Sequence, residues 1–568
     1  MVPGHHYEEW LDKRERFCYT LVNCERCDYL LLTTSEGGEI MGTYVNPGNQ
    51  AFKRIAGSNY VDKTGLISLM NDRVGGDECL VCVSRPRRFG KSYAAKMLTA
   101  YYDCSCDSHE LFDNRRIAEN ESYEEYINNY NVICLDISGF ISVAKREKTS
   151  LSDIPARVAK VIKDEVLEID PSAPKDKSLE DCLIHCVESP DGRPFIFVID
   201  EWDAMIREAK DEPIAQEAYL NMLRGWFKNT NFTPRVVAAA YMTGILPIKK
   251  DGSQSAISEF DEFSMLEPSE FAEFVGFTEE EVLGRCRGKK IGFEEIKDWY
   301  DGYDLVPVGS VYNPYSVMKA LKSGKCQSYW RRTSAAESLK YYINMDFEGL
   351  QETVARLIVG DRISVNTEGF ENDFESFESA DDVLTLLVHL GYLTYHETEK
   401  TVQIPNEEVR LEFKQFLTQK RINAGWISLI QRSQRLLENT IDERENEVAA
   451  ALDEIRGEQY APQYYNNEQS LRAIIKYAFI AAVGQYVKVE EMPGGKGLAD
   501  VVFIPVPFSR LPAMIVELKW NKTSGGAISQ IKEKKYGANL KPYVGNLLLV
   551  GINYDKKTGK HTCSIERI

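Results

Sequence analysis

The sequence predicts an α/β protein: a parallel sheet covered by helices, then a mainly helical region, then a second α/β domain. Three observations support this order. In the first 250 residues, short apolar runs alternate with helical stretches, which is typical of a parallel sheet buried on both faces. After about residue 255 the spacing of apolar residues becomes mostly helical. The last hundred residues return to alternating strands and helices.

Four apolar runs are the expected strands of the first region, and helical periodicity fills the intervals between them. The strands are expected at Cys79–Val83, Asn131–Gly139, Pro194–Asp203 and Arg235–Met242. Helices are expected at Ser92–Tyr102, Leu151–Glu168 and Ser178–Val187.

The later elements follow the same rules. A hairpin is expected at Gly391–Asn406 and a long helix at Arg432–Arg456. The final α/β region is expected to contain helix Ser470–Val483, strands Tyr486–Glu490, Ala499–Ile504 and Ala513–Lys519, helix Ala527–Tyr536 and strand Asn546–Ile552.

A chain of 568 residues is too long for one hydrophobic core. We expect an extension of uncertain order at 1–40, the first α/β domain at 41–254, a helical region at 255–330, a mixed and mainly helical connection at 331–460 and the last domain at 461–568. No apolar run approaches the roughly 18 to 20 residues of a membrane span, and the first residues lack an apolar signal-peptide core. A cytoplasmic location without a membrane partner is therefore expected.

Thirteen cysteines in a chain of this length do not indicate a disulfide scaffold. Three clusters could each supply part of a zinc site, although none has the paired spacing of a zinc finger. They are Cys18 with Cys24 and Cys27, Cys104 with Cys106 and His109, and Cys182 with His185 and Cys186. Free thiols are the favoured interpretation.

A phosphate-binding loop is indicated by SRPRRFGKS, which follows the first expected strand and begins a helix. Gly90 permits the turn, Lys91 carries the charge that reaches phosphate oxygens, and Ser92 can bind Mg²⁺. The motif lacks its first glycine, because Arg85 stands there. By itself the Gly-Lys-Ser triplet is common by chance.

A second motif supports the first. The apolar strand that begins at Phe195 ends in Asp200 and Glu201, where one carboxylate can organise Mg²⁺ and the next can polarise a water. Thr243, at the end of the fourth strand, is placed to sense a γ-phosphate. The alternative is a buried strand that ends in two acids beside a chance triplet.

The last domain contains a pair of carboxylates with a lysine. Asp500 begins one strand, and Glu517 and Lys519 point to one face of the next by period-2 alternation. Two carboxylates on adjacent strands suit Mg²⁺-dependent phosphodiester hydrolysis, in which the lysine stabilises charge or orients water.

In their order, YVDKTGLI, SRPRRFGKS, FVIDEWD, YMTGILPIK, WYDGYDL and VYNPYSV resemble the bacterial AAA-ATPase-like family that carries a C-terminal PD-(D/E)XK nuclease-like domain. The resemblance implies a P-loop ATPase sheet and a phosphate loop that includes Arg85, Arg88 and Phe89. It also implies a lid or winged-helix region at 255–330, ATP and Mg²⁺ as cofactors, DNA as a partner and a possible homo-oligomer.

The resemblance also implies a restriction-endonuclease-like fold for the last domain. Glu468 corresponds to an additional acid of the first helix, and Gln530 and Tyr536 to the glutamine and tyrosine of RecB-like members. Ala499 stands where the family's proline is expected, which is a variable position. Such a fold can also lose its chemistry and keep only binding.

The charge distribution is uneven. The net charge of −19 argues against a protein coated by nucleic acid. Between residues 519 and 560, however, nine lysines face two acidic residues, a local balance of +7. This patch suits a nucleic-acid module, or equally a solvated lysine-rich face. An aromatic cluster, Trp299, Tyr300 and Tyr303 around Gly302, could stack on bases but fits a packed turn better.

The leading hypothesis is thus an ATP-binding, ATP-hydrolysing protein coupled to a Mg²⁺-dependent nuclease that acts on DNA. The rival hypothesis is a nucleotide-controlled switch whose nuclease-like domain is an inert binding surface.

Overall fold

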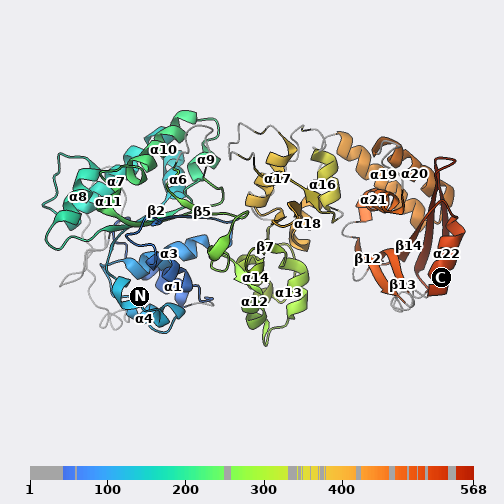
Figure 1. The fold of residues 1–568 in the computed structure, drawn as a ribbon, viewed down its shortest axis with the longest axis horizontal. Helices are drawn as coiled ribbons and strands as arrows, with labels where there is room; N and C mark the ends of the chain where they lie inside the picture. The colour runs from blue at the N-terminus through green and yellow to red at the C-terminus, as the bar shows by residue number, and fades with distance from the viewer. Residues whose placement is uncertain are drawn as a thin grey trace, which may run out of the picture. The chain divides into compact units, whose positions relative to one another are not determined.

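A computed structural model describes most of the chain from residue 42 to the C-terminus (Figure 1). The described segments are 42–57, 60–248, 257–330, 350–358, 360–368, 379–417, 424–459, 467–482, 485–494, 497–505, 509–534 and 545–568, with single residues at 342, 347, 370 and 377. The predicted extension at 1–40, with Cys18, Cys24 and Cys27, lies outside these residues, as does Tyr536.

Contacts between residues divide the chain into two compact units. Of the described residues, the first unit contains those from 42 to Val83, Lys91–Gly244 and those from 257 to Glu262. The second contains Ser84–Gly90, those from Ile245 to Ile248 and those from Phe263 onward. Among the described residues, no helix has the length and apolar character needed to cross a bilayer.

The first unit is built on a five-stranded sheet with the order β2-β3-β4-β1-β5. Its strands are β1 Leu80–Ser84, β2 Asn131–Asp136, β3 Phe195–Asp200, β4 Val237–Gly244 and β5 Asp261–Phe263. Strands β2, β3 and β4 pair in parallel, and Asp136, Asp200 and Thr243 align across them. The carboxyl ends of these three strands therefore meet at one level of the sheet.

Helices cover both faces of this sheet, as the alternating sequence pattern predicts. Helices α1 and α3 lie on one side, and α6, α7 and α10 lie on the other (Figure 1). The helices are α1 Gln50–Ala56, α2 Gly65–Asn71, α3 Lys91–Tyr102, α4 His109–Phe112, α5 Tyr123–Tyr126, α6 Ile137–Glu147, α7 Ile154–Ile169, α8 Leu179–Glu188, α9 Ala204–Glu208, α10 Pro213–Phe227 and α11 Thr233–Val236.

Two predicted strands are shorter than expected, and one of them is β3, which covers Phe195–Asp200 of the run expected at Pro194–Asp203. The run that begins at Asn131 ends as a strand at Asp136 instead of Gly139, because the Asp136 carboxylate caps α6. Its Oδ1 accepts hydrogen bonds from the backbone N–H groups of Ser138 and Gly139, at 3.0 and 3.3 Å. An aspartate that satisfies two free N–H groups is a strong helix start, and it outweighs the β-branched residues that follow.

The second unit begins with two small sheets and their helices. Along the chain, the strands of the sheet β6-β8-β7 are interspersed with α12, α13 and α14, and those of the sheet β10-β11-β9 with α16, α17 and α18. The bounds are β6 Phe277–Thr278, α12 Glu279–Cys286, α13 Phe293–Tyr300, β7 Tyr303–Leu305, β8 Gly309–Tyr312, α14 Pro314–Ser323, α16 Leu350–Ile358, β9 Ile363–Ser364, α17 Ala380–His389, β10 Thr394–His396, β11 Thr401–Gln403 and α18 Glu407–Leu417.

The aromatic cluster of this region forms packed structure. Tyr300 and Tyr303 are fully buried, and Gly302 has a positive φ of 106°. The Tyr303 hydroxyl donates to the Gly391 carbonyl at 2.8 Å. These two tyrosines are therefore committed to the core, and the glycine makes the turn that a residue with a Cβ disfavours.

The C-terminal part of the second unit is a mixed five-stranded sheet with helices on both faces (Figure 1). Its order is β12-β13-β14-β15-β16; β14 and β15 pair in parallel, and the other neighbours pair antiparallel. The bounds are α19 Ala424–Ile441, α20 Glu445–Gln459, α21 Glu468–Ala478, β12 Tyr486–Gly494, β13 Gly497–Pro505, β14 Ala513–Trp520, α22 Ser524–Lys534, β15 Leu547–Asp555 and β16 Lys560–Arg567.

Two features of this part differ from the sequence prediction. The long helix expected at Arg432–Arg456 is two helices, which separate near Glu443, a residue with a φ of 61°. The final strand β16 was not predicted, since its residues alternate in burial but carry charges on the exposed face. An edge strand with one solvated face has this weak apolar signal.

Strand β14 is buried along nearly its whole length, because α21 and α22 pack against it. Helix α22 also covers β15, where Ile528 and Ile531 join an apolar cluster with Ile515, Leu547 and Leu549. Gly551 on β15 allows the close approach: a Cβ there would lie 2.3 Å from the Ser524 carbonyl oxygen and 3.0 Å from the Ala527 Cβ.

We expect Gly551→Ala to destabilise the fold by about 1–3 kcal/mol, because α22 has to move away from the sheet. Gly525→Ala in the same helix is the matched control, since no atom lies within 4 Å of a Cβ built there. Urea unfolding of the two variants would check this; equal stability would contradict the packing of α22 on β15.

Candidate functional site

The first turn of α3 places the lysine and serine of the phosphate motif. Gly90, with a φ of 101°, directly precedes the helix, and Lys91 is its first residue. Lys91 is 5% exposed, and burial lowers its pKa, opposed by the charges of Glu201 and Asp200. A buried ammonium at a helix start is a strong attractor for an anion.

Asp200 ends β3 and lies beside this turn. The Ser92 hydroxyl donates to the Asp200 carboxylate, and the Glu201 backbone N–H donates to Asp200 Oδ1 at 3.0 Å. Burial raises the pKa of Asp200 to about 6, although the Ser92 hydrogen bond and the Lys91 charge oppose this shift. Lys91, Ser92 and Asp200, predicted from two motifs about 110 residues apart, are therefore brought together.

An arginine that sequence reasoning missed holds the next two acids. Glu201 has a φ of 52°, and its carboxylate forms an ion pair with Arg207 on α9. The same guanidinium donates from Nε to Asp203 at 2.8 Å, and Asp203 is fully buried. Arg207 stands one helical turn after Asp203, and this i, i+4 spacing was the available signal.

Thr243 aligns with Asp200 across the sheet, but its hydroxyl is already used. It donates to the Val83 carbonyl at 2.9 Å, and the residue is fully buried. Next to it, a Cβ on Gly244 would lie 2.7 Å from Asp203 Oδ1, so the glycine makes room for the buried acid. The Thr243 side chain thus links the end of β4 to the end of β1.

The phosphate-loop arginines have separate surroundings in the second unit. Arg85 is fully buried, and its Nη1 donates to the carbonyls of Phe263 and Ser264 at 2.9 and 3.0 Å. The Arg88 guanidinium lies 4.1 Å from the centroid of the Tyr315 ring and donates to the Tyr329 carbonyl at 3.1 Å. In place of the missing glycine, Arg85 therefore anchors the loop through backbone carbonyls.

The other two residues of this loop differ in exposure. Phe89 packs its ring edge-to-face on Tyr303, with centroids 5.1 Å apart. Arg87 is exposed, while its carbonyl accepts from Asn313 at 3.3 Å. Arg87 is thus the loop arginine whose side chain faces solvent.

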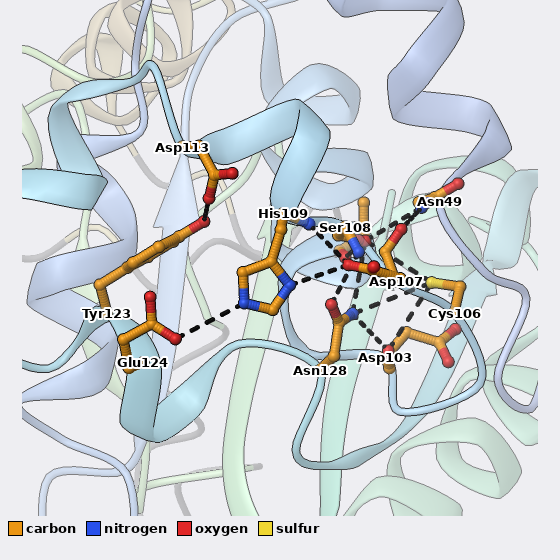
Figure 2. A network of polar contacts seen from close by, with 11 residues as sticks. Asn49, Asp103, Cys106, Asp107, Ser108, His109, Asp113, Tyr123, Glu124 and Asn128 are labelled. Atoms are coloured by element: carbon orange, nitrogen blue, oxygen red, sulfur yellow. Dashed lines mark hydrogen bonds and ion pairs between the residues drawn. The ribbon is translucent and has the colours of Figure 1, made fainter.

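Cys106 and His109 form part of a hydrogen-bonded turn (Figure 2), whereas the Cys104 thiol donates to Asn131 Oδ1 at 3.4 Å. His109 lies between two carboxylates, with its Nδ1 2.8 Å from Asp107 and its Nε2 3.6 Å from Glu124. The buried Ser108 hydroxyl donates to the Ala100 carbonyl at 2.6 Å. The cysteines pack around this turn as free thiols.

The cluster of Cys182, His185 and Cys186 is likewise engaged in local contacts. Cys182 donates to the Pro174 carbonyl, and Cys186 to Asp170. In the part of the chain that the structure describes, no three His, Cys, Asp or Glu side chains are grouped so that they could hold a metal ion.

In the C-terminal sheet, the two predicted carboxylates lie on the neighbouring strands β13 and β14. The paired register of these strands ends at Val501 with Val516, and Asp500 and Glu517 lie directly beyond that pair. Asp500 Oδ2 accepts from the Leu518 backbone N–H at 2.9 Å. Both acids are almost completely buried.

Glu517 collects donors from its own strand and from α22. Lys519 Nζ lies 3.0 Å from Glu517 Oε1, as expected for residues on one face of a strand. Gln530 of α22 donates to the same oxygen. The structure thus gathers Glu517, Lys519 and Gln530 at one place.

Helix α21 contributes an arginine that the sequence did not indicate. Arg472 Nη2 lies 2.6 Å from Asp500 Oδ1. Glu468, one turn earlier on α21, is exposed. Arg472 is therefore the residue of this helix that reaches the carboxylate pair.

Comparison with known proteins supports the first part of this description. Residues 47–253 match the AAA-ATPase-like family, which is described as a predicted AAA-ATPase. This segment contains Lys91, Ser92, Asp200, Glu201 and Thr243, and it is similar to an ATPase-like nucleotide-binding domain. A search of curated proteins found no match.

Among solved structures, the chain is similar to a Walker-type ATPase of Pyrococcus abyssi at 12% identity and a TM-score of 0.30, covering 62% of this chain and 94% of that one. The ORC2 protein of Aeropyrum pernix, solved in ADPNP–ADP complexes, is similar at 11% identity and a TM-score of 0.30, covering 64% and 97%. These likenesses are too distant to bear on function.

The raised pKa of Asp200 gives a signed prediction. Its folded pKa of about 6 exceeds the usual 3.8, so the ionised carboxylate opposes folding, and this cost grows with pH between those values. Asp200→Asn should therefore stabilise the protein, by up to about 3 kcal/mol at pH 8 and by less at pH 5. Urea unfolding at both pH values measures this.

Asp203→Asn is the contrasting variant, because it weakens the buried partner of Arg207. We expect a loss on the order of 3 kcal/mol at pH 8. A destabilised Asp200→Asn protein at pH 8 would show that burial does not dominate at Asp200.

Proposed function

We propose that this protein binds and hydrolyses ATP with Mg²⁺ in its first unit, and that this activity controls a Mg²⁺-dependent nuclease-like domain acting on DNA. The observation that carries the nucleotide part is the hydrogen bond between Ser92 and Asp200, with the buried Lys91 beside it. Two separate motifs converge there, which a chance Gly-Lys-Ser triplet does not explain.

The residues present fit Mg²⁺ and a nucleotide. The Ser92 hydroxyl and the Asp200 carboxylate are hard oxygen donors, and Mg²⁺ in such sites is typically held by one or two protein oxygens together with phosphates and water. Ser92 and Asp200 would hold the ion, whose positive charge would offset negative charge that develops on the phosphates. Lys91 would bind the β- and γ-phosphates, and the N–H groups at the start of α3 would cradle them.

Glu201 is the proposed acceptor of the water proton, and Arg207 is a positioning residue. Glu201 stands next to Asp200, and the Arg207 ion pair fixes where its carboxylate lies. Asp203 accepts hydrogen bonds from Nε and Nη2 of this guanidinium and so fixes the cation that pairs with Glu201. Thr243 supports the ends of strands β4 and β1 through its hydrogen bond to the Val83 carbonyl.

The nuclease part of the proposal rests on the carboxylate pair of the last domain. Asp500 and Glu517 are suitable oxygen ligands for Mg²⁺, Lys519 would stabilise charge at the scissile phosphate, and Gln530 orients Glu517. Lys522, Lys556 and Lys557 are exposed where β14 and β15 end. Positive charge at that end of the sheet suits a nucleic-acid backbone.

One observation favours the alternative of a nucleotide-controlled switch with an inert nuclease-like domain. Each carboxylate of the pair already has a cation: Arg472 for Asp500 and Lys519 for Glu517. A site neutralised in this way can serve the fold alone. A DNA-cleavage experiment distinguishes the active nuclease from the nucleotide-controlled switch.

Nucleotide binding is tested first with Lys91→Ala, which removes the cation that would meet the phosphates. We expect Mg²⁺–ATP affinity to fall at least about 100-fold, since charge-assisted contacts to phosphate contribute roughly 1.5–3 kcal/mol each and Lys91 would make more than one. Isothermal titration calorimetry measures this. Lys96→Ala on the exposed side of α3 is the control and should bind normally; unchanged affinity in Lys91→Ala would reject the site.

Cleavage is tested on linear, nicked and single-stranded DNA with Mg²⁺, with and without ATP. We expect Glu517→Ala to abolish cutting, because one of two metal-binding carboxylates is lost, while ATP binding persists. Glu533→Ala, which removes an exposed acid of α22, should cut like wild type. If the wild type fails to cut under every condition yet binds ATP, the switch replaces the nuclease.

A further inference from the structure

The Asp500 carboxylate is held at both of its oxygens. Arg472 Nη2 approaches Oδ1 at 2.6 Å, and the Leu518 backbone N–H donates to Oδ2 at 2.9 Å. The side chain of Asp500 is 12% exposed, and that of Arg472 is 23% exposed. A divalent cation that binds Asp500 therefore meets a carboxylate already occupied by a guanidinium.

Among the described residues, the charges of this cluster balance without a metal ion. Asp500 and Glu517 contribute two negative charges, and Arg472 and Lys519 contribute two positive ones. A divalent ion added to this buried group would leave two positive charges in excess, which is unfavourable away from water. One of the two cations has to leave for a metal ion to bind well.

Arg472 and Lys519 differ in their freedom to leave. Lys519 is nearly buried and lies on the same strand as Glu517, two residues away. Arg472 stands on α21, and its long side chain is partly exposed. The guanidinium can therefore turn toward solvent with less rearrangement than the lysine.

We propose that Arg472 is an internal competitor for the divalent cation at Asp500, and that a bound phosphodiester draws its guanidinium away and opens the carboxylate to the metal ion. This inference rests on the proposed nuclease site and adds its regulation. A guanidinium matches the geometry of a phosphate as well as that of a carboxylate. Nucleic acid and metal ion should then bind with positive coupling, each strengthening the other by the same factor.

The experiment measures Mn²⁺ binding to the full chain by electron paramagnetic resonance, without nucleotide, with and without a short single-stranded oligonucleotide. Binding at the carboxylate pair is the part that Glu517→Ala removes. In the wild type we expect weak binding that the oligonucleotide tightens. Arg472→Gln should bind Mn²⁺ about tenfold or more tightly without the oligonucleotide, because a charge-assisted hydrogen bond no longer competes.

Arg510→Gln is the matched control, since Arg510 is an exposed arginine of the same unit. It removes the same charge and should bind Mn²⁺ like wild type. Arg472→Lys keeps a positive charge but loses the planar fork of the guanidinium. Its Mn²⁺ affinity should rise less than that of Arg472→Gln. Arg472→Lys also provides the test if the glutamine variant, followed by circular dichroism, does not fold.

The outcomes separate this inference from the proposed function. Equal Mn²⁺ affinity in wild type, Arg472→Gln and Arg510→Gln, still lost in Glu517→Ala, would overturn the competition and leave the metal site standing. Oligonucleotide that tightens Mn²⁺ binding equally in wild type and Arg472→Gln would also overturn it. If no protein shows Mn²⁺ binding that depends on Glu517, both the competition and the metal-dependent nuclease are rejected.

Discussion

A carboxylate buried in protein has to be neutralised by hydrogen bonds or by a neighbouring cation, and this constraint shapes both candidate sites. In the first unit, Asp203 is fully buried and relies on Arg207, which also holds Glu201. In the second unit, Asp500 relies on Arg472. Arg207 comes from α9, the helix that directly follows Asp203, and Arg472 comes from α21, which packs against the sheet that carries Asp500. The helices are therefore placed by charge as well as by apolar burial.

The nucleotide site shows the same constraint in a weaker form. Parallel pairing brings Asp136, Asp200 and Thr243 to one level of the sheet, and α3 begins beside them. Among the described residues, Asp200 receives a hydrogen bond from Ser92 but forms no direct ion pair with an arginine, and burial still raises its pKa to about 6. A metal ion would supply the missing positive charge. Residual electrostatic cost of this kind is typical of functional sites, where stability is given up for chemistry.

In the C-terminal candidate site, two strands and two helices bring several charged and polar side chains together. Asp500 and Glu517 lie just beyond the paired stretch of β13 and β14, and Arg472 of α21 and Gln530 of α22 contact them. The close contact of α22 with the sheet depends on a glycine, Gly551, at the crossing. Helices α21 and α22 therefore pack against the sheet and also supply the polar partners of Asp500 and Glu517.

The sequence by itself determined the α/β class and most strands and helices, and it singled out the candidate residues Lys91, Ser92, Asp200, Asp500, Glu517 and Lys519, because apolar periodicity and short motifs are local properties. Only the tertiary structure decided which groups pair with them. Arg207 and Arg472 belong to no motif. Arg85, which stands where the motif has a glycine, is buried and donates hydrogen bonds to residues about 180 positions away. The end of β2 at Asp136 and the separate strand β16 depended on capping and edge pairing. Such pairings arise from long-range contacts whose partners are distant in the chain, and no local pattern encodes them.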